Sequence, residues 1–204
     1  EHLKKLCEVF DRIREANLTL NLDKCEFLRT ETRYLGHIIS KDGIRPDPRK
    51  IETIQIYPTP TTVTEIRAFL GLVGYYRRFI RDFATIARPL TQLTKKNSTF
   101  SWDDICQEAF DRLRDSLIEE PILKYPDPKR TFVLSTDASG FAVGAILSQM
   151  YDGQERPVAY ASRQLTKAEQ NYCTTEREGL ALLWGIKQFR TYLYGQEFIV
   201  YTDH

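Results

Sequence analysis

Three acidic residues in the last third of the chain are placed where carboxylates could act together. Asp137 follows an apolar run in "TFVLSTDASG", a pattern typical of a strand that leads into small residues. Glu178 lies near the start of a predicted helix, in "TEREGLALLWGI", and Asp203 ends "FIVYTD", a second strand pattern. A carboxylate at the C-terminal end of a strand is typical of sites in open α/β sheets.

The elements between these acids predict that they meet at one edge of a sheet. We expect strands at 131–136, 141–149 and 156–162, with an Asp-Gly turn before the third. Tight turns make these strands an antiparallel meander, and a helix from about Thr175 to Leu193 then crosses back to the last strand. Asp137 and Asp203 would therefore end parallel strands, and the helix that carries Glu178 would start at the same edge.

Three converging carboxylates repel one another unless a cation neutralises them. Oxygen ligands suit Mg²⁺ or Mn²⁺, and two such ions roughly 3.5–4 Å apart commonly cleave phosphodiesters. The pattern predicts Asp137, Glu178 and Asp203 as metal ligands and catalytic residues. Simpler alternatives remain for each: Asp137 as a turn former, Asp203 as a loop residue, and Glu178 in a capping box with Thr175. Glu176 could also be the intended acid.

The motifs around these acids carry a family resemblance. "STDAS", "TEREGLAL" and "VYTDH", with "PVAYASRQLTKAEQNY" between them, resemble the RNase H domain of gypsy-type LTR retroelement polyproteins. The resemblance implies that Asp137, Glu178 and Asp203 bind Mg²⁺ or Mn²⁺, two ions in a complete site, and cleave the RNA strand of an RNA–DNA hybrid. It also implies a fourth acid on a later helix, which we expect past His204.

A second cluster combines basic and aromatic residues in "FLGLVGYYRRFIRDFA". It contains Tyr75, Tyr76, Arg77 and Arg78. Arginines can neutralise phosphates, and aromatic rings can pack on sugars or bases. Tyrosines at helical spacing are also common core residues, so the cluster alone does not decide between nucleic-acid contact and packing.

The order of further motifs extends the resemblance over essentially the whole chain. "LTLNLDKCEF", "YLGH", "DGIRPDPRKI" and "FLGLVGYYRRFI" resemble the palm end and thumb of the reverse transcriptase in the same polyproteins, and "FSWDDICQEAF" and "PILKYPD" resemble its connection. By that resemblance Lys24 would lie near the phosphates of the incoming nucleotide. Tyr34, Gly36 and His37 would belong to a hairpin that grips the primer end. The alternatives are a solvated surface lysine for Lys24 and a core or turn histidine for His37.

Other local signals predict the remaining elements. Apolar spacing predicts a first helix that Asn17 ends, then strands in "LTLNL" and "RYLGHIISKDGI". We expect a short helix after Asp47, a helical block over 63–95 interrupted at its glycines, and a helix from about Asp103 that Pro121 ends. A capping box of Thr62 and Glu65 should open the helical block.

Composition sets the broad class of the protein. Of 204 residues, 28% are charged and 42% hydrophobic, which excludes a disordered chain. The four cysteines form no CxxC pair and the chain has three histidines, which argues against a zinc site and a disulfide framework. We see neither a membrane-spanning run nor a secretory signal, and we expect an intracellular protein, in a cytoplasmic retroelement particle or the nucleus.

These observations predict an α/β (α+β) fold in four regions. They are a palm end (1–57), thumb helices (58–98), a connection (99–128) and the N-terminal part of an RNase H-like mixed sheet with a crossover helix (129–204). The resemblance implies RNA-directed DNA synthesis and metal-dependent cleavage of RNA in hybrids, with the rest of the Pol polyprotein and primer–template nucleic acid as partners. The polymerase aspartates would precede Glu1, so we expect this chain alone to be inactive. The alternatives are a non-catalytic nucleic-acid-binding module and a domesticated structural or interaction protein.

Overall fold

The computed structural model describes residues 2–96, 98–118 and 122–203, which fall into two units, Glu1–Thr30 and Glu31–His204. The first unit contains α1 (His2–Glu15) and the 3-10 helix η1 (Leu22–Lys24). The helix ends at Glu15, two residues before the predicted stop at Asn17, which has a φ of 53°. The strand predicted in "LTLNL" is wrong, because the Asn21 side chain accepts a hydrogen bond from the amide of Asp23 and caps η1 instead.

The second unit starts with a small antiparallel sheet of β1 (Glu31–Tyr34), β2 (His37–Ser40) and β3 (Gly43–Pro46). The single strand predicted over "RYLGHIISKDGI" is therefore three strands. Leu35 and Gly36 form the first turn with φ values of 46° and 73°. Two consecutive positive φ angles are the geometry of a tight hairpin turn.

Six helical segments follow: α2 (Pro48–Gln55), α3 (Val63–Gly74), η2 (Arg77–Phe79), α4 (Phe83–Ile86), α5 (Arg88–Leu93) and α6 (Asp104–Ile118). The predicted start of α2 is confirmed, since Asp47 accepts from the amide of Arg49 and Pro48 is the first helical residue. The predicted break at Gly71 is wrong, because α3 continues to Gly74. Pro121, the expected end of α6, lies outside the described residues.

One hydrophobic core joins α2 to α6. Its buried members include Ile54, Phe69, Leu90, Phe110 and Leu123, each at most 1% exposed. These residues come from three of the four regions expected from sequence, so packing does not follow the boundaries at 57/58 and 98/99. Those boundaries stay predictions about sequence regions, whereas the folded unit is continuous from Glu31 onward.

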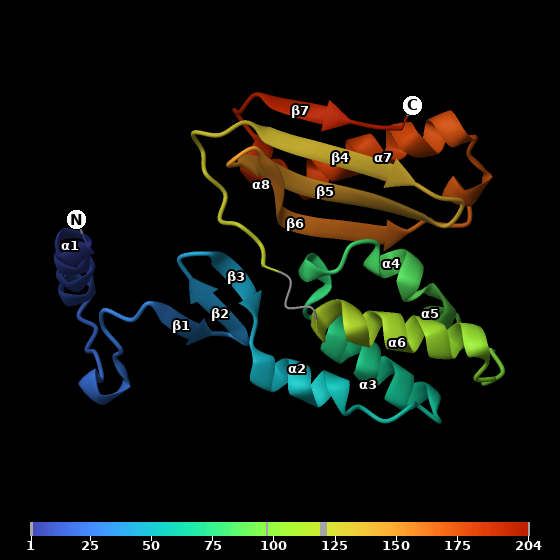
Figure 1. Cartoon of the computed structure of the whole chain (residues 1–204), viewed down its shortest axis with the longest axis horizontal. Coiled ribbons are helices and arrows are strands. Elements are labelled where there is room, and N and C mark those ends of the chain that lie inside the picture. Colours follow the sequence, from blue (N-terminus) through green and yellow to red (C-terminus); the bar gives the residue numbers. More distant parts are fainter. Residues whose placement is uncertain (1, 97, 119–121, 204) are drawn as a thin grey trace. The chain divides into compact units, whose positions relative to one another are not determined.

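The second sheet is built from β4 (Phe132–Ala138), β5 (Ala142–Tyr151), β6 (Gln154–Gln164) and β7 (Phe198–Tyr201), in the order β6-β5-β4-β7. The meander is antiparallel and β7 runs parallel to β4, which confirms the predicted topology (Figure 1). The crossover contains η3 (Glu169–Asn171), α7 (Thr174–Gln188) and α8 (Arg190–Leu193). The predicted single helix is divided at Phe189, the C-cap of α7.

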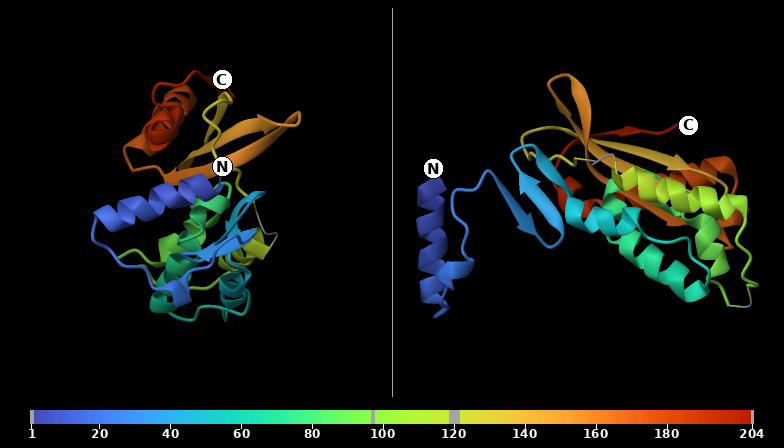
Figure 2. Two further views of the ribbon diagram at one scale, coloured as in Figure 1. Left: turned by 90° about the vertical axis from the view of Figure 1, so that its left-hand side faces the viewer. Right: turned by 60° about the horizontal axis from the view of Figure 1, so that its bottom comes forward.

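The two faces of this sheet carry different helices (Figure 2). A Cβ on Gly185 of α7 would lie 3.2 Å from the side chains of Thr136 and Ala145, so α7 packs closely on that face. A Cβ on Gly144 of β5 would lie 3.1 Å from Oδ1 of Asp82, just before α4. Gly144 and Ala145 are successive residues of β5 and so point to opposite faces of the sheet. The segment at the start of α4 therefore covers the face opposite to α7.

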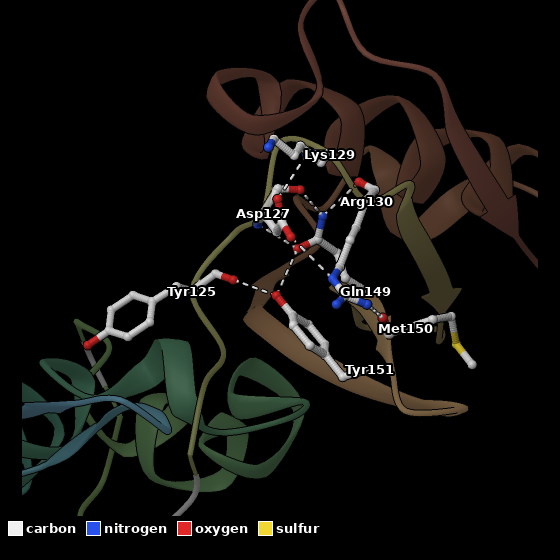
Figure 3. A network of polar contacts seen from close by, with 7 residues as sticks. All are labelled: Tyr125, Asp127, Lys129, Arg130, Gln149, Met150 and Tyr151. Atoms are coloured by element: carbon white, nitrogen blue, oxygen red, sulfur yellow. Dashed lines mark hydrogen bonds and ion pairs between the residues drawn. The ribbon is translucent and has the colours of Figure 1, made fainter. Parts of the chain in front are cut away.

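A polar network attaches the segment before β4 to the end of β5 (Figure 3). Gln149 is fully buried; its Oε1 accepts from the amide of Asp127, and its Nε2 donates to the carbonyls of Asp127 and Arg130. Tyr151 donates to the carbonyl of Tyr125 at 2.8 Å. A buried amide needs such partners, and here they fix the direction in which the chain enters the sheet.

Among the described residues, no helix combines the length and the apolar character needed to cross a lipid bilayer.

Candidate functional site: a carboxylate edge and a hairpin groove

The parallel pair β4 and β7 brings two of the predicted acids to one edge of the sheet. Ser135 is in register with Tyr201, the last residue of β7. Asp137 lies two residues beyond Ser135, within β4, and Asp203 lies two residues beyond Tyr201, after the end of β7. Both carboxylates therefore leave the sheet at the same end, as the topology predicted, and both residues are exposed.

The third acid comes from α7, and the structure separates the two glutamates that the sequence left as alternatives. The helix is capped at Cys173, whose amide donates to the Glu176 carboxylate at 2.9 Å. The alternative in which Thr175 and Glu178 form a capping box is therefore wrong, because the N-cap is Cys173 and the capping acid is Glu176. Glu178 is instead buried at 7% exposure. Carboxylates this buried are rare unless they are paired or bind a metal.

The described residues do not assemble a metal site from these acids. Thr136 faces α7. Because successive residues of β4 alternate between the two faces of the sheet, Asp137 and its cross-strand partner Gly144 lie on the opposite face. Glu178 comes from α7 and therefore lies on the other side of the sheet from Asp137. Within residues 2–96, 98–118 and 122–203, no group of three or more His, Cys, Asp or Glu side chains could hold a metal ion. The donors have the chemistry that Mg²⁺ prefers, but the metal role of Asp137, Glu178 and Asp203 stays a prediction.

Asp82 is a neighbour of this edge that sequence patterns did not reveal. It has a φ of 55° and lies against Gly144, the cross-strand partner of Asp137. Burial raises the pKa of the Asp82 carboxyl, and the negative charge of Asp137 raises it further, while Arg81 and Arg112 lower it. The only sequence signal was an acid within "RFIRDFA", and its position depends on how the helical segments pack on the sheet.

The second candidate region is the hairpin turn between β1 and β2. Tyr76 donates from its hydroxyl to the carbonyl of Gly36 at 3.0 Å, and Tyr75 donates to the carbonyl of Leu35. Tyr76 is 2% exposed, and burial raises its pKa to about 12, with smaller contributions from the charges of Tyr75 and Asp47. It thus remains a hydrogen-bond donor across the physiological pH range.

His37 is held beside the same turn. Its Nδ1 donates to the carbonyl of Leu35 at 2.8 Å, and its ring lies 5.4–5.6 Å from the rings of Tyr75, Tyr76 and Phe79. The structure therefore places His37 as a packed turn residue. Tyr34 precedes the turn and is 62% exposed. Their contact with a primer end stays a prediction.

The predicted phosphate-binding residues differ in their surroundings. Arg77 donates from Nη2 to the carbonyl of Ser162 on β6 at 3.0 Å, which gives this side chain a structural contact between the helices and the sheet. Arg78 is half-buried, and its Nε has no hydrogen-bond partner among the described residues. Lys24 is exposed in η1 and belongs to the first unit. Its position near the phosphates of a nucleotide stays a prediction.

A groove of about 580 Å³ separates the hairpin turn from α3, and its wall is mainly apolar. The lining residues are Leu35, Gly36, Lys50, Ala68, Gly71, Leu72, Tyr75 and Tyr76. Tyr75 is 53% exposed, and a Cβ on Gly71 would meet no atom within 4 Å, so the groove is open along α3. A mainly apolar surface with a lysine at its side can accept sugars and one phosphate of a nucleic-acid backbone.

Comparison with known sequences identifies the relatives of this chain. A family profile described as "RNase H-like domain found in reverse transcriptase" matches residues 102–200. The Pol polyproteins of the Drosophila melanogaster transposons 297 and gypsy are 47% and 42% identical over the whole chain. A Tf2 transposon polyprotein of Schizosaccharomyces pombe is 35% identical. The chain spans only 16–21% of the length of these relatives.

Solved structures with a similar fold come from the foamy viral protease–reverse transcriptase. One, described as a complex with RNA/DNA hybrid, has a TM-score of 0.80 and 26% identity over 98% of this chain and 27% of its own. Another, a complex with dsDNA, has a TM-score of 0.79 and 28% identity over 98% of this chain and 42% of its own. These similarities confirm the predicted fold class.

Proposed function

Because the chain belongs to the gypsy-type Pol polyproteins of LTR retrotransposons, in their reverse transcriptase and RNase H-like region, we propose that it binds an RNA–DNA hybrid or primer–template duplex. The groove between the hairpin turn and α3 is the observation that carries this proposal. Two structures of the similar foamy viral protease–reverse transcriptase are complexes with RNA/DNA hybrid and with dsDNA, which supports the same class of ligand here.

In this proposal, the groove holds the sugar–phosphate backbone by shape and charge. Tyr75 offers an exposed ring, and Gly71 leaves room for close approach of a sugar to α3. Lys50 supplies a positive charge from α2. Arg78 lies in the segment that follows α3, and its Nε has no hydrogen-bond partner within the part of the chain that the structure describes. These contacts read shape and charge and do not depend on base identity.

The carboxylates at the edge of the second sheet are the second part of the proposal. Asp137, Glu178 and Asp203 would hold Mg²⁺ or Mn²⁺, and the bound cation would activate water and stabilise the leaving oxygen in cleavage of the RNA strand. The chain itself brings two of these carboxylates to one sheet end, and the third is a buried side chain of α7. RNA-directed DNA synthesis and RNA cleavage are proposals for the longer polyprotein, since the chain spans about a fifth of its relatives.

A groove-filling variant tests the binding proposal. Gly71→Leu should leave folding intact, because a Cβ there meets no atom within 4 Å, and should weaken binding of a fluorescent hybrid at least tenfold by filling the groove. Thr64→Leu adds a similar side chain at an exposed position in the first turn of the same helix and should bind like the wild type. Equal affinity of the two variants would reject the groove as the binding surface.

Cation binding tests the acid edge separately from nucleic-acid binding. Mn²⁺ titration followed by electron paramagnetic resonance should detect an ion that Asp137→Asn weakens. Asp152→Asn is the matched control, because Asp152 lies in the β5–β6 turn and asparagine accepts its φ of 50°. Equal Mn²⁺ affinity in both variants would instead favour the narrower alternative of a non-catalytic nucleic-acid-binding module.

A further inference from the structure

Arg177 reaches from α7 to the loop that follows Asp137. It occupies the fourth position of the helix, directly before the buried Glu178. Its Nη1 lies 3.3 Å from the point that a Cβ on Gly140 would occupy. Gly140 belongs to the loop between β4 and β5, so the guanidinium lies over the sheet end at which Asp137 leaves β4.

The loop that receives Arg177 is tightly formed. Oγ of Ser139 accepts from the amides of Phe141 and Ala142, at 3.2 and 3.0 Å, and the amide of Ser139 donates to the carbonyl of Ala142. These bonds hold Gly140 in place, and its lack of a side chain leaves room for the guanidinium. The loop beside Arg177 is therefore held by its own hydrogen bonds, and α7 positions the backbone of Arg177.

One donor of Arg177 is left without an acceptor within the described chain. Its Nε is buried and has no hydrogen-bond partner, and no ion pair of Arg177 occurs among the described residues. A guanidinium has five N–H donors, and a buried donor without an acceptor destabilises the folded state. Glu176, its neighbour on the helix, already accepts from the amide of Cys173. An unsatisfied buried group of this kind calls for an explanation.

We propose that Arg177 is a positioning residue that binds a phosphate of the nucleic-acid strand entering the carboxylate edge. The planar fork of a guanidinium matches two phosphate oxygens, and it would bring a polyanion toward acids that otherwise repel it. A role as a counter-ion of the acids would produce an ion pair, and none involving Arg177 is found among the described residues. This inference deepens the proposed function and rests on it.

The salt dependence of hybrid binding tests this role without requiring cleavage. The probe is a hybrid of DNA with 2′-O-methyl RNA, which lacks the 2′-hydroxyl, at a fixed low Mg²⁺ concentration. Arg177→Gln should weaken binding about tenfold and reduce the slope of log K against log salt by about 0.9, the value for one lost phosphate contact. Arg177→Lys keeps the charge and should retain most of the slope. Lys187→Gln removes an exposed charge from the last turn of the same helix and should match the wild type.

Thermal unfolding of the four proteins separates binding from folding, since a purely structural role would change stability and leave the salt slope unchanged. If the wild type binds the hybrid and Arg177→Gln binds with the same affinity and slope, the role of Arg177 is rejected while the proposed function stands. If the wild type does not bind the hybrid, the proposed function is rejected and the inference with it.

Discussion

Tyr76 donates its hydroxyl hydrogen to the carbonyl oxygen of Gly36, 40 residues earlier in the chain and 3.0 Å away. The bond joins the end of α3 to the turn of the β1–β2 hairpin, and Tyr76 is 2% exposed. A turn residue with positive φ is thereby fixed against a helix that lines the groove. The shape of the proposed binding surface depends on this contact.

Removing that hydroxyl should loosen the hairpin without creating a cavity. Tyr76→Phe is expected to lower the free energy of unfolding by about 0.5–1.5 kcal/mol, because the Gly36 carbonyl still accepts from the amide of Asp47. Urea denaturation measures this change. Tyr194→Phe, at a position 78% exposed, should have no effect; an equal loss in both variants would contradict a specific role for the Tyr76 bond.

Two glycines of α7 should respond in opposite directions to the same substitution. Gly185→Ala places a methyl group 3.2 Å from Thr136 and Ala145, so overpacking should cost about 1–3 kcal/mol, less the helix-propensity gain. Gly179→Ala meets no atom within 4 Å and should stabilise α7 by about 0.5–1 kcal/mol. Thermal unfolding of both variants distinguishes them. Stabilisation by Gly185→Ala would contradict the close packing of α7 on the sheet.

The charge of Asp137 should be detectable at Asp82. Burial is the main cause that raises the pKa of Asp82, and the Asp137 carboxylate adds to it. Asp137→Asn removes that negative charge and should lower the pKa of Asp82 toward its ordinary value without reaching it. Carbon-detected NMR titration of the aspartate carboxyls measures the shift. An unchanged Asp82 titration in Asp137→Asn would show that the two carboxylates do not interact.

Glu169 should make the stability of the second unit depend on pH in the acid range. Two hydrogen bonds from Arg163, at 2.8 and 2.9 Å, and one from the amide of Thr166 lower the pKa of Glu169 to about 2. A carboxyl group whose pKa is lower in the folded than in the unfolded state stabilises the folded protein. This stabilisation is complete at pH values above the pKa of the unfolded state, about 4.3, and is lost as the pH falls toward the folded-state pKa of about 2. We expect this loss to be about 1–2 kcal/mol.

Urea denaturation at pH 7 and pH 3 checks the Glu169 prediction. Glu169→Gln should reduce the difference in stability between the two pH values, because the titrating partner of Arg163 is gone. Glu197→Gln, at an exposed position, should keep the wild-type difference. An identical pH dependence of Glu169→Gln and wild type would contradict the prediction.

The sequence predicted those parts of the fold that depend on local signals. The strand order around Asp137 and Asp203 followed from turn residues and the handedness of crossovers, and the cap at Asp47 followed from its neighbour Pro48. The position of Asp82 was not predictable, because it depends on contacts between segments about 60 residues apart in sequence. Likewise, Glu176 became the capping acid because α7 starts one residue earlier than expected, a shift that local patterns do not resolve.

The hairpin shows the same division between local and tertiary information. Motif order indicated a turn between Tyr34 and His37, whereas periodicity alone predicted one strand there. The structure confirms the turn, which is supported by the hydroxyls of Tyr75, the C-cap of α3, and of Tyr76, the next residue. A single strand pattern cannot encode this support, because it comes from a helix 40 residues later.

Hydrogen exchange of the chain with and without excess non-cleavable RNA–DNA hybrid tests whether the groove is the nucleic-acid surface. We expect that hybrid slows exchange in peptides covering the hairpin turn and the second half of α3, while the β5–β6 turn at Asp152 and Gly153 exchanges as before. If hybrid is bound, as shown by fluorescence anisotropy, and exchange in the groove peptides is unchanged, the groove is not the binding surface and the proposed function is contradicted at its main point.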